Sequence, residues 1–106
     1  MKEKDEIIVK ITDFAGSFAE NKDIARELRE KQIFPNLKKN KTILLDYSKV
    51  SGTTQSFTHA LISEAIRTLG ISVLDRISFK NCNDEVKKVI SIVVEYMQRN
   101  IDKPIS

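Results

Sequence analysis

Residues 43–66 read ILLDYSKVSGTTQSFTHALISEAI and combine, in order, an apolar run, a polar loop and an amphipathic segment. The run Thr42–Tyr47 is continuous enough to predict a strand buried on both faces, as strands of parallel sheets are. The loop after it bends at Gly52. From Phe57 onward, apolar residues recur at helical spacing as far as Gly70, a suitable C′ residue. The stretch therefore predicts a strand, a loop and a helix in direct succession.

The residues before this stretch predict another strand and helix. The run Ile7–Ile11 is apolar and β-branched, and the DFAG turn after it contains Gly16, which can adopt a positive φ. The S-x-x-E spacing of Ser17–Glu20 matches a capping box, so a helix is expected to start there. Because Pro35 disfavours helical geometry at the preceding residue, we expect this helix to end near Ile33.

The residues after the stretch predict a third strand and a third helix. Ile71–Phe79 is expected to be a strand at an edge or with a bulge, since Asp75 and Arg76 interrupt its apolar pattern. Beyond it, a broad apolar face continues along an amphipathic helix, and residues 102–106 are expected to fray. The order β-α-β-α-β-α predicts a small α/β fold with three helices on a mainly parallel or mixed sheet. We expect a single domain over 1–106 with its core over 7–97.

Composition excludes several classes of function. The chain has 106 residues, 41% apolar and 31% charged, with a net charge of +3, which is too balanced to predict nucleic-acid binding. The start of the chain carries no apolar signal region, and no run is long enough to span a bilayer, so a cytoplasmic protein without a membrane partner is expected. With one cysteine, Cys82, and one histidine, His59, neither a disulfide nor a metal site is expected, and no cofactor is predicted.

The polar loop lies at the edge of the sheet where functional sites are usual. In parallel α/β sheets this is the crevice at the carboxyl ends of the strands. A glycine and hydroxyl residues before a helix can expose amides that hold an anion such as phosphate. The same residues also suffice as an ordinary N-cap, with Thr54 or Ser56 accepting an amide hydrogen bond. The pattern of a nucleotide-binding P-loop is absent.

Other polar residues near this edge have structural interpretations beside functional ones. Asp46 could accept hydrogen bonds from the loop amides or act as a phosphoacceptor, for which the usual additional carboxylates are few. Asn81 and Asn83 are expected to be turn and cap residues. His59, one turn into the helix, is expected to be a solvent-facing helix residue and not a general base. Cys82 is expected to be structural.

The order of these motifs resembles the STAS domains, the sulfate-transporter and anti-sigma-factor-antagonist domains. It is closer still to a small bacterial family of STAS-like domains of unknown function. The residues that carry this resemblance are Gly16-Ser-Phe-Ala19, Leu45-Asp-Tyr47, Val50, Thr54-Gln-Ser-Phe57 and the FKNCN segment Phe79–Asn83. The similarity extends from about Ile7 to Met97.

The resemblance implies a regulatory interaction module and not an enzyme. Anti-sigma antagonists bind a GHKL-type ATPase that phosphorylates a serine at this helix start, and the added charge is an adequate switch. In this sequence Gln55 occupies the usual acceptor position and cannot be phosphorylated. Ser56 or Thr54 could substitute, although Phe57 stands where the family has glycine.

Two hypotheses from different classes follow. In the first, a protein partner binds the loop, the first turn of the helix, the exposed helix residues Thr58, His59 and Ser63, and the DFAG turn. The loop residues concerned are Ser51, Gly52, Thr53, Thr54, Gln55, Ser56 and Phe57, with Asp46, Gly16, Asn81 and Asn83 supporting them. In the second, the loop is the anion site of a small-ligand or nucleotide sensor. A weak homodimer is an open alternative.

Overall fold

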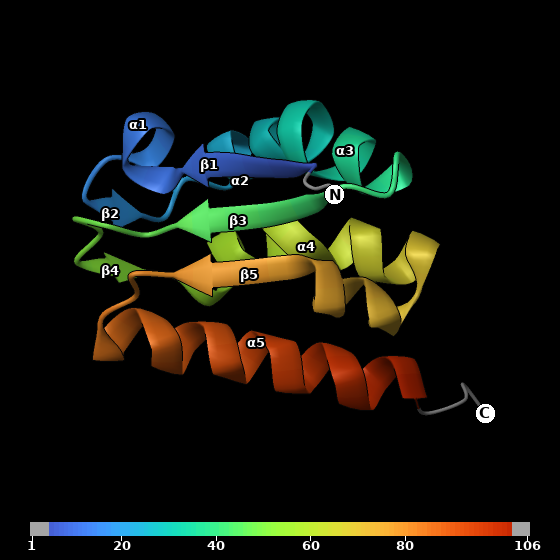
Figure 1. Ribbon diagram of the computed structural model, residues 1–106. Helices are drawn as coiled ribbons and strands as arrows, with labels where there is room; N and C mark the ends of the chain where they lie inside the picture. The colour runs from blue at the N-terminus through green and yellow to red at the C-terminus, as the bar shows by residue number, and fades with distance from the viewer. Residues whose placement is uncertain (1–4, 103–106) are drawn as a thin grey trace.

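The computed structural model describes residues 5–102, and side chains as far as residue 99 (Figure 1). The strands are β1 (Glu6–Lys10), β2 (Phe18–Ala19), β3 (Thr42–Asp46), β4 (Gly52–Thr53) and β5 (Ile77–Lys80). The α-helices are α1 (Ile11–Ala15), α2 (Lys22–Leu28), α3 (Phe34–Lys38), α4 (Gln55–Leu69) and α5 (Asp84–Asp102). A π-helical turn, η1 (Arg29–Ile33), joins α2 to α3, and a 3-10 helix, η2 (Ile71–Arg76), precedes β5. The predicted α/β class is confirmed.

The main sheet has the order β1-β3-β5 and is parallel throughout, as predicted. In register, Lys10 pairs with Asp46 and Asp46 with Lys80, so the three strands end side by side. Beyond these ends lies a second, two-residue parallel ladder between β2 and β4 (Figure 1). The carboxyl edge of the sheet therefore carries an additional ladder that holds the loop after β3.

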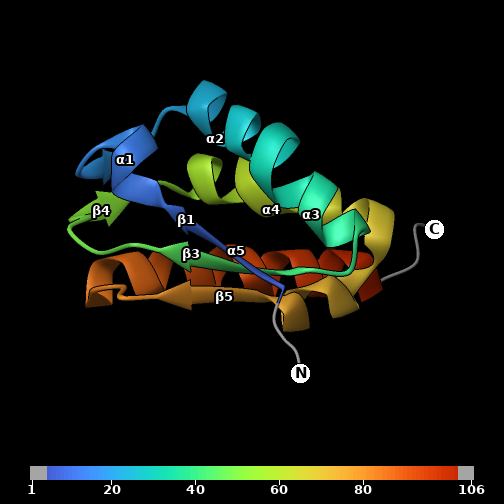
Figure 2. The ribbon, with the colours of Figure 1, turned by 45° about the horizontal axis from the view of Figure 1, so that its top comes forward.

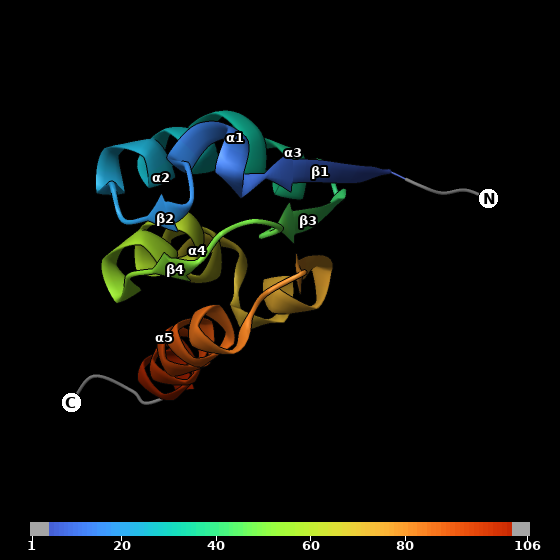
Figure 3. The ribbon, with the colours of Figure 1, turned by 90° about the vertical axis from the view of Figure 1, so that its left-hand side faces the viewer.

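The long helices cover only one face of this sheet. Figures 2 and 3 show α2, α4 and α5 on the same side of the strands, with α4 between the other two. Ile43 and Leu45 point into this layer and are buried, whereas Leu44 is only half-buried and Ile8 on the neighbouring strand is 58% exposed. The prediction that Thr42–Tyr47 is covered on both faces is therefore wrong.

The core lies between the sheet and the helices, with α4 at its centre. The largest fully buried side chains are Tyr47, Phe57, Ile11, Ile33, Leu37, Ile43, Leu45, Leu61, Ile62, Ile66, Val9 and Val73. Four of them come from α4, whose apolar residues recur at the predicted helical spacing and end before Gly70. Gly70 has φ 95°, consistent with the predicted helix end.

The predicted start of the first long helix is wrong. Phe18 and Ala19 form β2 instead, and α2 begins after Asn21, whose side chain accepts a 2.8 Å hydrogen bond from the Asp23 amide. Phe18–Ala19 pairs with β4 instead, and the Ser17 and Ala19 carbonyls accept hydrogen bonds from the Ser51 and Thr54 amides, so this segment is extended and does not start a helix. The DFAG turn is mostly the short helix α1, and Gly16 after it has φ 74°.

The predicted helix end near Ile33 is also wrong, because the chain stays helical through Pro35. Phe34 has helical φ and ψ of −62° and −47°, and Pro35 lies in the first turn of α3. A proline in a first helical turn needs no amide donor. The π-helical turn η1 ends at Ile33, and α3 begins directly after it. Pro35 therefore lies at the start of a new helical segment and does not end the helical stretch.

The first part of the predicted third strand is helical. Ile71–Arg76 forms η2, and only Ile77–Lys80 forms β5, an edge strand as expected. Arg76 donates hydrogen bonds of 2.9 Å to the Leu37 carbonyl and 3.3 Å to the Lys41 carbonyl. Its guanidinium therefore binds carbonyl groups at and just after the end of α3. Residues 103–106 of the predicted frayed tail lie outside the described residues, and residue 102 is the last of α5.

Candidate functional site

The site is built at the carboxyl edge of the sheet, where Asp46 organises the loop after β3. Its Oδ1 accepts a 2.9 Å hydrogen bond from the Ser48 amide, a second hydrogen bond from the Ser48 hydroxyl, and a 2.9 Å bond from the Asn81 side chain. The bonds from Asn81 and Ser48 lower the pKa of Asp46 to about 2. Asp46 is therefore a charged acceptor that fixes the turn over 47–50, in which Lys49 has φ 66° and the Val50 amide bonds the Tyr47 carbonyl.

Residues 51–54 are held by hydrogen bonds to the segment before α2. The Ser51 amide and hydroxyl bond the Ser17 carbonyl at 2.7 and 3.0 Å. The Thr53 hydroxyl and the Thr54 amide bond the Ala19 carbonyl at 2.7 and 3.1 Å. The stretch that sequence patterns assign to a loop is thus a fixed segment, and Thr53, only 7% exposed, is unsuited to contact a partner.

Asn83 holds the same segment from the other side. Its side-chain amide donates a 3.0 Å hydrogen bond to the Ser51 carbonyl, while its oxygen accepts a 2.8 Å bond from the Val86 amide and caps α5. Asn81 binds Asp46 in the same way across the ends of β3 and β5. Asp46, Asn81 and Asn83 therefore support residues 51–54 through hydrogen bonds, whereas the Gly16 amide bonds the Thr12 carbonyl within its own turn.

Gly52 has a different role from the predicted bend. It lies in β4, is buried, and has no positive φ. A Cβ atom at this position would lie 2.5 Å from Cε1 of Phe18, whose ring rests on the glycine. The expectation that Gly52 contacts a partner is wrong. The Phe18 ring occupies the space in which a side chain at position 52 would lie.

The start of α4 separates capping residues from accessible ones. The Thr54 side chain accepts a 3.1 Å hydrogen bond from the Phe57 amide and is the N-cap of α4. Gln55 and Ser56 follow it and are exposed. Phe57, in contrast, is fully buried, so the prediction that it belongs to the partner surface is wrong. Its apolar ring extends the core to the first turn of α4.

The predicted exposure of two further α4 residues is also wrong. Thr58 is fully buried and its hydroxyl bonds the Thr54 carbonyl at 3.2 Å, while Ser63 is only 5% exposed. Both lie against the neighbouring helices, because α4 is covered on two sides. His59 is half-buried, and burial together with the charge of Arg67 lowers its pKa. It lies in a groove and not on an open helix face.

This groove is the feature that sequence patterns did not reveal. It runs between α2, α4 and α5 and has a volume of about 590 Å³. Its lining residues are Lys22, Arg26, Arg29, Gln55, Ser56, His59, Ala60, Ser63, Arg67, Ile92, Val93 and Tyr96. The spacing of Lys22, Arg26 and Arg29 puts them on one face of α2 and η1, but the sequence does not show which helix faces them.

The described residues 5–99 contain neither a cluster of metal ligands nor an activated thiol. No group of three or more His, Cys, Asp or Glu side chains there is arranged to hold a metal ion. Burial raises the pKa of the Cys82 thiol, which therefore has less thiolate character than a free cysteine. Within residues 5–102, no helix is long and apolar enough to cross a bilayer.

The structure defines a small α/β domain with a parallel sheet, whose carboxyl edge carries a hydrogen-bonded segment just before the central helix. Residues 25–87, more than half of the chain, match the family model described as "STAS-like domain of unknown function (DUF4325)". The chain belongs to this STAS-like family. The matched segment includes the LDY, TQSF and FKNCN motifs, whereas Gly16–Ala19 precedes it. No curated protein and no solved structure matches the chain.

Proposed function

We propose that this domain is a non-enzymatic regulatory module that binds a protein partner through the start of α4. The observation that carries the proposal is the fixed presentation of Ser51, Gln55 and Ser56, all exposed, on a segment bonded to Ser17 and Asn83. A surface that is already ordered loses little conformational entropy when a partner binds. Membership of the STAS-like family supports the regulatory class.

An exposed aromatic ring supports the same edge of the sheet as a binding surface. Phe18 in β2 is 48% exposed and pairs with Gly52 in the ladder that holds residues 51–54. Aromatic side chains are enriched at protein interfaces because they bury a large area with few rotatable bonds. The proposed surface therefore combines polar residues at the start of α4 with the exposed ring of Phe18.

The partner proposed is a GHKL-type ATPase, by analogy with anti-sigma antagonists, and the proposed switch is phosphorylation of Ser56. Among the three hydroxyl candidates, the Thr54 oxygen caps α4 and the Ser51 hydroxyl bonds the Ser17 carbonyl. Ser56 is exposed, and its hydroxyl has no hydrogen-bond partner within residues 5–99. A phosphate there would add about −1.5 to −2 charges at the centre of the proposed surface.

A binding assay with a matched variant tests the surface. Ser56→Glu is expected to reduce capture of a purified GHKL-type ATPase in a pull-down by at least ten-fold. Ser72→Glu, an exposed serine in η2, is the matched control and should bind like the unmodified protein. Equal capture of all three proteins would place the interface elsewhere. Phosphorylation is tested separately, since incubation with the ATPase and ATP should add one phosphate, and Ser56→Ala should abolish that mass increase.

A further inference from the structure

The groove between α2, α4 and α5 concentrates positive charge in one concave surface. Lys22, Arg26 and Arg29 line it from α2 and η1, and Arg67 lines it from α4. None of the lining residues is acidic. Like charges gathered in a concavity raise the local potential and attract anions, because the low-dielectric walls focus the field. This arrangement is costly for the unoccupied protein unless a negatively charged group compensates it.

The neighbouring carboxylates do not neutralise this charge inside the groove. Asp23 binds Arg26 at 2.9 Å and Glu30 binds Arg29 at 2.9 Å, but both carboxylates are more than half exposed and neither lines the groove. The Arg26–Asp23 pair is the more exposed of the two, and exposed ion pairs are weak and readily exchanged for another anion. Lys22 and Arg67 have no ion pair among the described side chains, so these two cations and Arg26 are available to a ligand.

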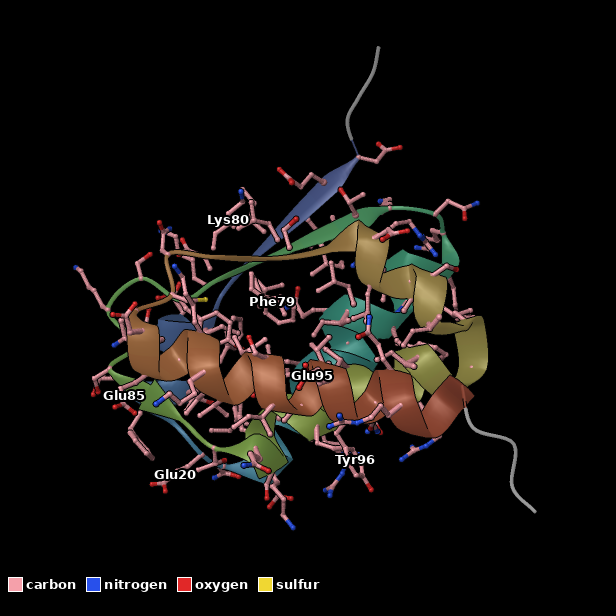
Figure 4. All side chains as sticks on the ribbon, turned by 90° about the horizontal axis from the view of Figure 1, so that it is seen from below. Glu20, Phe79, Lys80, Glu85, Glu95 and Tyr96 are labelled. Atoms are coloured by element: carbon pink, nitrogen blue, oxygen red, sulfur yellow. The ribbon has the colours of Figure 1, made fainter. Side chains whose placement is uncertain are left out.

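The groove also has an apolar side, which distinguishes it from a simple basic patch. Ile92 and Tyr96 of α5 line it and are 44% and 54% exposed, two of the five exposed large hydrophobic residues of the described chain. Figure 4 shows Tyr96 projecting from α5 on the side away from the sheet, whereas Phe79 lies between β5 and α5. A ligand in the groove can thus place a ring against α5 and its charge against α2 and α4.

Size and orientation further define the ligand. A volume of about 590 Å³ lies within the range of about 300–1,000 Å³ typical of small-molecule sites. The start of α4 lies at one end of the groove, where Gln55 and Ser56 line it, and its first-turn amides and dipole favour an anion there. Arginine forks bind the oxygens of phosphate and carboxylate groups in bidentate fashion, whereas a halide offers no such pair of oxygens.

We propose that this groove binds a small phosphorylated ligand with a planar or apolar portion, its phosphate held by Lys22, Arg26 and Arg67 and its ring packed against Tyr96 and Ile92. The cations of this site lie on α2 and in the second half of α4, away from Ser51, although the groove shares Gln55 and Ser56 with the proposed partner surface. It also moves the anion site from the loop amides, where the sequence placed it, to the side of the helix.

His59 provides a direct probe, because it is the only histidine in the chain and lines the groove. The imidazole C–H signal is followed by NMR during titration with ADP at low ionic strength without magnesium. Sodium pyrophosphate serves as a probe without a ring, and adenosine as a probe without phosphate. We expect saturable shifts with ADP and weaker binding of pyrophosphate, whereas adenosine should bind at least ten-fold more weakly than ADP.

Matched variants test which cations hold the phosphate. Arg67→Gln and Lys22→Gln should each weaken ADP binding, measured by calorimetry, by about ten-fold. Lys39→Gln removes an exposed charge outside the groove and should change the affinity less than two-fold. Dispersed amide spectra of each variant establish that it is folded, since all three side chains are on the surface.

Several results would overturn the proposal. No saturable response to ADP or pyrophosphate, or the same response to sodium chloride of equal ionic strength, would exclude a phosphate site. Unchanged affinity in both Arg67→Gln and Lys22→Gln would exclude the groove. Saturation by hexaglutamate without any response to ADP would assign the groove to an acidic peptide segment instead of a small ligand.

Discussion

The side-chain amide of Asn81 donates a 2.9 Å hydrogen bond to the Asp46 carboxylate and so joins the ends of two adjacent strands. Asp46 ends β3, and Asn81 follows β5 with φ 61°, a left-handed conformation that asparagine tolerates better than most residues. The bond fixes the turn after β3 relative to the loop that leads into α5. The position of the proposed partner surface therefore depends on a contact outside that surface.

The first prediction concerns the acid dependence of this contact. Hydrogen bonds from Asn81 and Ser48 lower the pKa of Asp46 from 3.8 to about 2. Because the folded pKa lies below the unfolded value, the stabilisation is complete above about pH 4 and is lost as the pH falls towards 2. Solvent screening of this partly exposed group reduces its contribution to about 1 kcal/mol.

We therefore expect Asp46→Asn to lower the free energy of unfolding by about 1 kcal/mol at pH 7. The two proteins should converge as the pH approaches 2, where the wild-type carboxylate becomes protonated in the folded state. Urea unfolding at pH 7, 4 and 2.5 measures this difference. A constant difference at all three values would show that the charge of Asp46 contributes nothing.

The second prediction concerns the hydroxyl group of Tyr47. The side chain is fully buried, burial raises its pKa, and the hydroxyl has no hydrogen-bond partner among the described residues. A buried donor without a partner costs free energy, so Tyr47→Phe should leave the unfolding free energy unchanged or raise it by up to about 1 kcal/mol. Urea unfolding measures the change. A loss of more than 1 kcal/mol would reveal an internal water bonded to this hydroxyl.

The third prediction concerns the contact between Gly52 and the Phe18 ring. A Cβ atom at position 52 would lie 2.5 Å from the ring, so Gly52→Ala must displace Phe18 and should cost about 1–2 kcal/mol. Phe18→Ala in the same chain removes the obstacle, and the alanine should then cost less than about 0.5 kcal/mol. A double-mutant cycle by thermal or urea unfolding measures this coupling, and additive effects would contradict the proposed contact.

The fourth prediction concerns the titration of His59. Burial, followed by the charge of Arg67, lowers the pKa of His59 below its ordinary value of 6.5. The neutral form is therefore favoured in the folded protein, and the associated stability is lost as the pH falls through 6.5 towards the folded value. An NMR titration should give a midpoint below 6.5, and Arg67→Gln should raise it. A midpoint at or above 6.5 in the unmodified protein would contradict the half-buried position.

The sequence predicts those elements whose signals are local and strong. The apolar spacing of α4, the positive φ of Gly70 and the parallel order of the strands all follow from composition and periodicity. The hydrogen bonds of Asp46 and the cap formed by Asn83 agree with the structural interpretations of these residues. Each of these features depends on a residue and its near neighbours along the chain, or on the general rules of α/β folds.

The features that were mispredicted depend on contacts between distant segments. The capping box at Ser17 is a genuine local pattern, but Phe18 and Ala19 instead pair with β4. The basic groove could not be predicted because it requires α2 and α4 to be placed side by side. The sequence predicts that Thr58 faces solvent, but tertiary packing buries its side chain completely.

The anchors of residues 51–54 have one further consequence, for the order of folding. Ser51 and Ser17 are 34 positions apart, as are Thr53 and Ala19, and Asn83 reaches Ser51 across 32 positions. Contacts between residues this far apart in the sequence are expected to form late in folding, because closing the intervening loops costs conformational entropy. A nascent or partly unfolded chain should therefore lack the proposed partner surface, and the Ser51 amide should exchange its hydrogen only through cooperative opening. A partner bound at this surface would then distinguish a fully folded domain from a partly folded one.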